Sequence, residues 1–234
     1  MTQVLAAEFE DAIQALRNDK TEALAGLIRE RTGAPIRKLL VVGCGSGVEA
    51  GVLARELRAE VVGIDLDPSF DSTAAAAIDL RQGDATCLEF ASGSFDFVFS
   101  YHALEHIPAY GKALAEMDRV LSKGGAYCIG TPNRLRLLGY LGSNDATWRD
   151  KVAWNLADWS ARLLGRFRNE YGAHAGFSPS ELKASLVKAF GQADEITLPY
   201  YLRAYQGYPV WISLLGKSGL GRFLFPSIYF MGRK

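Results

Sequence analysis

A glycine-rich turn is the segment of this 234-residue chain best suited to approach a ligand closely. It consists of Gly43-Cys44-Gly45-Ser46-Gly47 and follows a short aliphatic run. Glycines allow a tight turn and leave room for a ligand beside the backbone. In an open α/β sheet, ligands bind outside the carboxyl ends of the strands, where such turns lie. The turn by itself is also compatible with a structural role, so its neighbours decide between the two.

Two aspartates follow the turn at the predicted ends of the next two strands. Asp65 comes 18 residues after Gly47, and Asp84 stands in the sequence Gly83-Asp84-Ala85. A carboxylate at the first position can accept hydrogen bonds from both hydroxyls of an adenosine ribose. At the second position, a carboxylate can accept from the adenine amino group while a backbone N–H donates to a ring nitrogen. The ordered set therefore favours a nucleoside site over three unrelated turns.

The elements that would carry these residues alternate between strand and helix. Short apolar runs predict buried strands, and amphipathic or alanine-rich segments between them predict helices. This alternation calls for a doubly wound, mostly parallel, Rossmann-like α/β sheet with helices on both faces. We expect strands at 39–42, 61–64, 79–83, 95–100, 126–130, 193–198 and 224–230, and helices between them at 48–57, 69–78, 110–121 and 180–190.

Two segments stand outside this alternation within a single predicted domain, 1–234. Residues 1–34 predict an N-terminal helical cap, and residues 134–176 predict a helical insertion or lid over the substrate side of the sheet. Apolar residues in the insertion recur every three or four positions, which we interpret as a helix core, although an aromatic wall for a ligand is the alternative. They are Val152, Leu156, Trp159, Leu163 and Phe167, with Trp148 and Trp154 nearby. Arginines of this segment, such as Arg134 and Arg136, form either a solvated face or a site for an anionic group.

Residues 38–132 resemble the class I S-adenosylmethionine-dependent methyltransferases, most closely the small-molecule, type 11-like subgroup. The glycine turn is similar to the first motif of that family, Val62-Gly63-Ile64-Asp65 to the second, and Gly83-Asp84-Ala85 to the adenine-binding turn. The resemblance implies a seven-stranded sheet whose last strand is antiparallel. It also implies methyl transfer from S-adenosyl-L-methionine, by in-line displacement, to an O, N or C atom of a small-molecule acceptor.

The same resemblance assigns the cofactor residues. The glycine turn would pass the methionyl and ribose parts, Asp65 would hold the ribose, and Leu66 would pack on the adenine. Residues after the fourth strand would flank the sulfonium. The implied cofactor-binding residues are Gly43, Cys44, Gly45, Gly47, Asp65, Leu66, Asp84, Ala85, Ser100 and Tyr101.

Three histidines and Glu105 are candidates for the catalytic base. A hydroxyl acceptor must lose its proton at or near transfer, and histidine suits proton transfer at neutral pH. His102 is expected nearest the methyl group, followed by His106, while His174 comes after the predicted insertion. The alternative for each is a structural or hydrogen-bonding role. The chemistry needs no metal, and no metal-ligand pattern is present.

One position departs from the family pattern. Val41 stands where the family usually has an acidic residue that helps to hold the methionine ammonium. Its presence implies weaker binding, transfer of that role to a neighbouring residue, or a catalytically degenerate binding protein. An NAD-dependent oxidoreductase is a further alternative, but its G-x-G-x-x-G fingerprint differs from the G-x-G-x-G found here.

Composition excludes several functional classes. Hydrophobic residues make up 49% of the chain and charged residues 22%, which excludes a disordered protein. The net charge of zero argues against nucleic-acid binding. The three cysteines form no disulfide framework, and neither a signal peptide nor a membrane-spanning segment is recognisable. We therefore expect a cytoplasmic monomer or homodimer without stable membrane insertion.

Charge and hydropathy are nevertheless uneven along the chain. Residues 132–234 carry 14 Lys/Arg against 7 Asp/Glu, which either reflects drift in surface charge or favours an anionic substrate. Residues 208–231 are rich in apolar and aromatic side chains. This stretch predicts a final strand pair with its connection, and contact with a membrane or a lipid-like substrate is the alternative.

Overall fold

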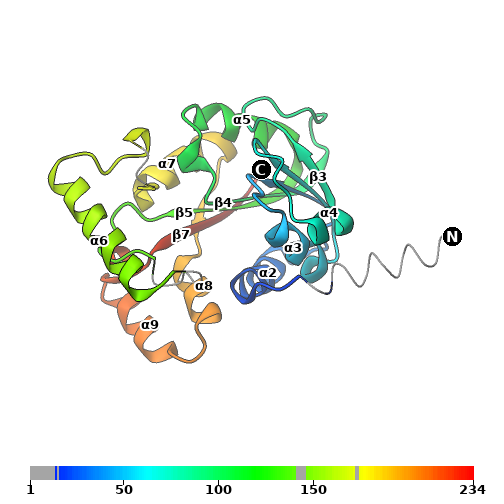
Figure 1. Ribbon diagram of the computed structural model, residues 1–234. Coiled ribbons are helices and arrows are strands. Elements are labelled where there is room, and N and C mark those ends of the chain that lie inside the picture. Colours follow the sequence, from blue (N-terminus) through cyan, green and yellow to red (C-terminus); the bar gives the residue numbers. More distant parts are fainter. Residues whose placement is uncertain (1–13, 15, 141–145, 172–173) are drawn as a thin grey trace.

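The computed structural model describes residues 14, 16–140, 146–171 and 174–234, which build a seven-stranded sheet with helices on both faces (Figure 1). The strand order is β3-β2-β1-β4-β5-β7-β6. Strands β1 to β5 are parallel, and β7 runs antiparallel to β5 and β6. The predicted fold class and the antiparallel last strand are thus confirmed. The strands are β1 Lys38–Val42, β2 Glu60–Asp65, β3 Asp79–Gln82, β4 Phe95–Tyr101, β5 Leu121–Pro132, β6 Asp194–Glu195 and β7 Ser227–Arg233.

Each face of the sheet is covered by its own group of helices. Alternate residues of a strand point to opposite faces. Leu39 and Val41 of β1 pack in the core beneath α2, α3 and α8, whereas Leu40 and Val42 pack in the core beneath α5 and α7. The helices are α2 Asp19–Thr32, α3 Val48–Leu57, α4 Ser72–Ala77, η1 Leu104–His106, α5 Tyr110–Val120, α6 Trp148–Leu163, η2 Asn169–Tyr171, α7 Pro179–Phe190, α8 Thr197–Ala204, α9 Pro209–Lys217 and α10 Gly221–Leu224.

The N-terminal helical cap is seen in part. Residues 1–13 and 15 of the predicted segment 1–34 lie outside the described residues. Helix α2 begins after Asn18, whose side-chain oxygen accepts a hydrogen bond from the Thr21 N–H at 3.1 Å. This capping bond satisfies one of the free N–H groups of the first turn.

The C-terminal region corrects the sequence prediction. The strand expected at 193–198 is limited to Asp194–Glu195, and the chain turns into helix α8 at Thr197. Pro199 explains the difference, because it has no N–H for a strand ladder but is tolerated in the first turn of a helix. The expected connection holds α9 and α10, and β7 begins at Ser227 rather than at residue 224.

Helix α6 contradicts the interpretation of its apolar stripe as a helix core. None of its residues is buried, and Leu163 is 89% exposed. Phe167, beyond the helix, is the member of the stripe that is buried. The helix lies between β5 and α7 in the chain, and its role as a lid stays a prediction. No helix among the described residues is both long enough and apolar enough to cross a bilayer.

Candidate active site

The glycine turn joins β1 to α3 where the chain order of the strands reverses. Gly43, Gly45 and Gly47 all have positive φ, at 73°, 52° and 86°. A side chain at Gly43 would collide with that of Ala103, which follows β4, and one at Gly47 would collide with Leu80 of β3. The turn therefore requires glycine both for its backbone conformation and for close contact with neighbouring strand ends.

A large cavity of about 1110 Å³ opens at this edge of the sheet. Its lining comes from the ends of four parallel strands, which is where an open α/β sheet binds ligands. Most of the residues that the sequence predicts for the cofactor meet here, but Gly47 and the fully buried Ser100 do not reach the lining. The predicted residues that line it are Gly43, Cys44, Gly45, Asp65, Leu66, Asp84, Ala85, Tyr101, His102 and His106.

The two aspartates lie at one end of the large cavity. Asp65 Oδ2 accepts a hydrogen bond from the Gly45 N–H at 2.7 Å, which ties the glycine turn to β2. Asp84 accepts from the Thr86 N–H at 2.8 Å, and this bond lowers the pKa of the exposed Asp84 carboxyl, so that it stays ionised. Each carboxylate retains lone pairs for a ligand. Leu66, which is 66% exposed, offers an apolar face between them.

Tyr101 and His102 separate the large cavity from a second one. Both residues line both cavities; Tyr101 is the last residue of β4, and His102 follows it. His102 has a φ of 52°, a left-handed conformation that is rare outside glycine. Such local strain clusters at functional sites. Its Nε2 lies 3.0 Å from Ser227 Oγ.

The electrostatic surroundings keep His102 neutral. Burial lowers the pKa of His102 to about 3, and the positive charges of Arg136, His174 and His106 act in the same direction. The ring keeps accessible surface toward the cavities, so a bound molecule can reach it. A neutral imidazole can accept a hydrogen bond from a hydroxyl, although so low a pKa makes it a weak base.

The second cavity, of about 360 Å³, is here called the tyrosine cavity. Tyr200 and Tyr201 come from α8 and Tyr229 from β7, and the Tyr200 and Tyr229 ring centroids are 4.2 Å apart. Burial raises the pKa of Tyr101 to about 12, so its phenol stays protonated. The wall is therefore aromatic with neutral hydroxyls. Its lining residues are Lys20, Tyr101, His102, Pro132, Arg136, Tyr140, His174, Tyr200, Tyr201, Tyr205, Pro226, Ser227 and Tyr229.

The other two candidate histidines lie beside each other. His106 lines the large cavity, His174 lines the tyrosine cavity, and their ring centroids are 4.7 Å apart. The structure thus brings all three predicted histidines to the boundary of the two cavities. Among the described residues, no group of three or more His, Cys, Asp or Glu is arranged to hold a metal ion.

Glu105 is a buried acid that lines neither cavity. Its side chain is 1% exposed, and its two carboxylate oxygens have no hydrogen-bond partner within the described ranges. The His106 imidazole Nε2 lies 3.9 Å from Glu105 Oε1. Burial raises the pKa of Glu105 to about 7.

Sequence reasoning missed two features of the site. Glu49, in the first turn of α3, lines the large cavity, and burial raises its pKa to about 7. The tyrosines of α8 were hidden because that segment was expected to be a strand. The spacing of Tyr200, Tyr201 and Tyr205 is the signal that could have revealed them, since residues one helical turn apart share a face.

Comparison with known proteins identifies the family of the segment that carries these residues. A family model described as a methyltransferase domain matches residues 40–129. A ubiquinone biosynthesis O-methyltransferase from Nitrosococcus oceani is 29% identical over 192 residues, which cover 77% of this chain and 74% of that protein. Residues 40–129 form a domain of the class I S-adenosylmethionine-dependent methyltransferase family. The match to residues 40–129 contains the glycine turn and both aspartates of this methyltransferase.

Two further comparisons show how much of each relative resembles this chain. A chloroplastic tocopherol O-methyltransferase from Arabidopsis thaliana is 34% identical over 116 residues, 46% of this methyltransferase, which spans only 33% of the plant protein. A solved phosphoethanolamine N-methyltransferase 2 from Haemonchus contortus has a TM-score of 0.55 and 18% identity, and covers 90% of this chain and 52% of its own. At that identity the likeness shows the fold.

The structure shows the surroundings of Val41, which stands where the family usually has an acidic residue. Val41 is 2% exposed and lies in the core beneath α3 and α8. Glu49 stands over the same face of the sheet, because it belongs to α3 and its charge acts on Tyr101 and Tyr200. Asn18 donates to Glu49 Oε1 at 3.5 Å. This methyltransferase thus has a carboxylate near the glycine turn, but it comes from the helix and not from the strand.

Proposed function

We propose that this methyltransferase transfers the methyl group of S-adenosylmethionine to a small-molecule acceptor in the tyrosine cavity. The observation that carries the proposal is the meeting of two cavities at Tyr101 and His102. In-line displacement requires the acceptor atom to approach the methyl carbon from the side opposite the sulfur, so donor and acceptor must bind on opposite sides of the methyl group. The large cavity suits the donor, and the tyrosine cavity suits the acceptor.

The residues of the large cavity fit the cofactor in size and chemistry. When bound, S-adenosylmethionine supplies a methyl group that is already activated by its sulfonium. Asp65 accepts from the ribose hydroxyls, Asp84 and Ala85 recognise the adenine edge, and Leu66 covers the ring. Tyr101 closes the cavity at the sulfonium end. Gly47 and Ser100, which do not line the cavity, support its walls.

Glu49 takes the role that Val41 cannot perform. The cofactor carries an ammonium group, for which a carboxylate is the natural partner. Asp65 and Asp84 lie among the residues for the nucleoside, whereas Glu49 lies near Asn18 and Tyr101. We therefore assign the methionine ammonium to Glu49.

The acceptor is an aromatic compound with a hydroxyl group. Six tyrosines line the tyrosine cavity, and their rings suit stacking with another ring. Arg136 does not favour an anionic acceptor, because its guanidinium is bonded to Asp158 at 3.1 Å and to backbone carbonyls. The relative from Nitrosococcus oceani is likewise an O-methyltransferase by name.

His102 is the group that receives the proton of the acceptor. The hydroxyl donates a hydrogen bond to the neutral imidazole, and its proton passes to the ring as the new O–CH₃ bond forms and the C–S bond breaks. Burial and the charge of Arg136 hold down the pKa of His102, and His174 and His106 add to the effect, so that the proton is released to solvent. The role of His106 and His174 is positioning and electrostatic.

Calorimetric titration with S-adenosylhomocysteine tests the cofactor site. We expect about micromolar affinity for the wild type. Asp65→Ala should weaken binding at least about tenfold, because two hydrogen bonds to the ribose are lost. Glu89→Ala, at an exposed position outside the cavity, should bind like the wild type. A folded wild-type protein that fails to bind would overturn the proposal.

Acceptor classes are then compared by the release of S-adenosylhomocysteine from S-adenosylmethionine. Phenols, amines and carboxylic acids form the panel, and transfer to phenols is the expected result. Transfer to amines alone would contradict the proposal that the acceptor is an aromatic compound with a hydroxyl group.

We also propose a cytoplasmic location, since Cys44, Cys87 and Cys128 are free thiols that suit a reducing compartment.

A further inference from the structure

All four tryptophans of the chain are exposed, and all lie on α6 or α9. Trp148, Trp154 and Trp159 of α6 are 70%, 42% and 44% exposed, and Trp211 of α9 is 69% exposed. Large aromatic side chains are ordinarily concentrated in cores and interfaces. Their collection on two helices indicates a surface that contacts something beyond the protein.

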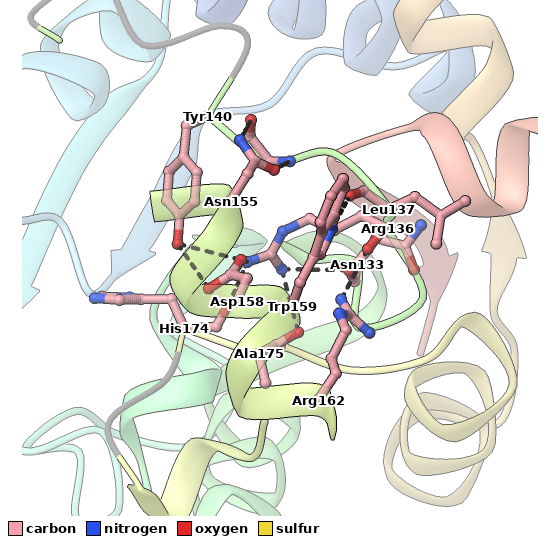
Figure 2. A network of polar contacts seen from close by, with 12 residues as sticks. Asn133, Arg136, Leu137, Tyr140, Asn155, Asp158, Trp159, Arg162, His174 and Ala175 are labelled. Carbon is pink, nitrogen blue, oxygen red and sulfur yellow. Dashed lines mark hydrogen bonds and ion pairs between the residues drawn. The ribbon is translucent and has the colours of Figure 1, made fainter. Parts of the chain in front are cut away.

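Within the described ranges, helix α6 presents a face of exposed apolar side chains. Its polar groups attach it to the segment before it: Asn155 Oδ1 accepts from the Gly139 N–H at 2.7 Å, and Trp159 Nε1 donates to the Leu137 carbonyl at 2.7 Å (Figure 2). The spacing of its exposed apolar residues places them on one face. These residues are Trp148, Val152, Leu156, Trp159 and Leu163.

Helix α9 and its flanking residues carry a second group of exposed apolar side chains. Leu137 is 52% exposed, and its N–H donates to the Phe223 carbonyl of α10 at 2.7 Å, which links the attachment of α6 to the α9–α10 segment. Both helices lie at the end of the molecule farthest from β3 and α4 (Figure 1). The exposed apolar residues of this part are Tyr208, Val210, Trp211, Leu214 and Leu220.

The same surface is positively charged. Residues 148–168 carry five Lys/Arg and two Asp/Glu, and one of those acids, Asp158, is paired with Arg136. Residues 209–226 carry Lys217 and Arg222 and no Asp or Glu, whereas Arg203 of α8 is paired with Glu30 of α2. Exposed tryptophan and leucine beside lysine and arginine is the composition of helices that lie in a membrane interface. Anionic lipids attract such a surface.

We propose that α6, α9 and residues 137–138 form a docking surface for an anionic lipid bilayer. The helices would lie in the interfacial plane, with tryptophan at the level of the headgroups, and would not span the membrane. A second copy of the chain is a poorer occupant. A two-fold symmetric dimer would place this positive surface against itself, and like charges would repel.

The docking surface adjoins the tyrosine cavity through residues that line this cavity and contact α6. Arg136 and Tyr140 line that cavity, and both contact Asp158 of α6, Arg136 at 3.1 Å and Tyr140 through its hydroxyl at 3.3 Å (Figure 2). If the proposed function holds, docking gives an acceptor dissolved in the bilayer access to the tyrosine cavity. Bilayer binding itself does not depend on methyl transfer.

The tryptophans make the experiment sensitive to this surface, because all four lie on α6 or α9. The protein is mixed with vesicles of phosphatidylcholine, with or without phosphatidylglycerol, and followed by emission and vesicle flotation. We expect a blue shift and flotation with phosphatidylglycerol vesicles, and weakening of both by salt. The double variant Leu156→Ser and Leu163→Ser, which retains every tryptophan, should bind vesicles at least about tenfold more weakly.

Controls separate this result from misfolding and from the cofactor site. Val187→Ser removes an apolar side chain that is 41% exposed on α7, and it should bind vesicles like the wild type. Every variant should retain binding of S-adenosylhomocysteine. Absence of the shift and of flotation in a protein that binds S-adenosylhomocysteine would overturn docking while leaving the proposed function intact. Equal binding to both kinds of vesicle, or a dimer whose formation shifts the emission, would also overturn it.

Discussion

Glu49 is the residue whose role depends most on a single charge. We expect Glu49→Gln to weaken S-adenosylhomocysteine binding about tenfold above neutral pH, because an amide cannot replace the ionic hydrogen bond to the ammonium. 5′-Methylthioadenosine lacks that ammonium, so its affinity should not change. Since burial raises the pKa of Glu49 to about 7, wild-type affinity for S-adenosylhomocysteine should fall as pH drops below 7. Calorimetry with the two ligands measures both effects.

A matched variant controls this experiment. Glu56→Gln changes the same residue type on α3 outside the large cavity and should leave both affinities unchanged. Equal losses of affinity for the two ligands in Glu49→Gln would assign Glu49 a structural role instead.

Sequence reasoning found Asp65 and Asp84 because they follow predicted strands within the matched motifs. It missed Glu49 because a carboxylate inside a helix acquires its position from tertiary packing.

At the scale of elements, the attachment of α6 is the feature open to test. Arg136 is 4% exposed, and its ion pair with Asp158 is the charged contact that holds the helix. Asp158→Asn leaves the guanidinium without its counter-ion, a loss that is worth about 3 kcal/mol when a pair is buried. We expect at least about tenfold faster tryptic cleavage within α6 and a raised KM for the acceptor, with cofactor affinity unchanged.

Asp118→Asn serves as the control for the α6 attachment. It removes an ion pair with Lys234 at 3.4 Å, away from both cavities, and should alter neither cleavage of α6 nor the acceptor KM. Cleavage that stays slow in Asp158→Asn would show that the remaining contacts are enough to hold α6 in place.

The apolar stripe of α6 was assigned to a core because periodicity reveals a common face and not what covers it.

At the scale of the whole molecule, the central sheet was predictable and the acceptor side was not. Strands β1, β2 and β4 are short, largely apolar and mostly buried runs, and β5 contains such a run at 126–130, so local sequence is enough to identify them. The acceptor cavity depends on α8, which sits where a strand was expected, and on β7, which pairs with β5 from a distant part of the chain. Contacts of that kind leave no local signal.

The buried acid Glu105 should make the stability of the whole fold depend on pH. Folding raises its pKa from 4.5 to about 7, so the folded protein holds this proton more tightly than the unfolded chain does. This contribution to stability is fully present below pH 4.5 and is lost as pH rises through 7, because an unpaired carboxylate then remains in the interior. The loss amounts to about 3 kcal/mol.

Glu105→Gln removes this ionisation while keeping the size of the side chain. We expect it to stabilise the fold by about 1–3 kcal/mol well above neutral pH, and to give no gain near pH 4.5, where Glu105 is already protonated. Urea unfolding at both pH values measures the difference, and Glu89→Gln at an exposed position should show none. A Glu105→Gln effect of equal size at the two pH values would mean that packing of the amide, and not the charge, determines stability at this position.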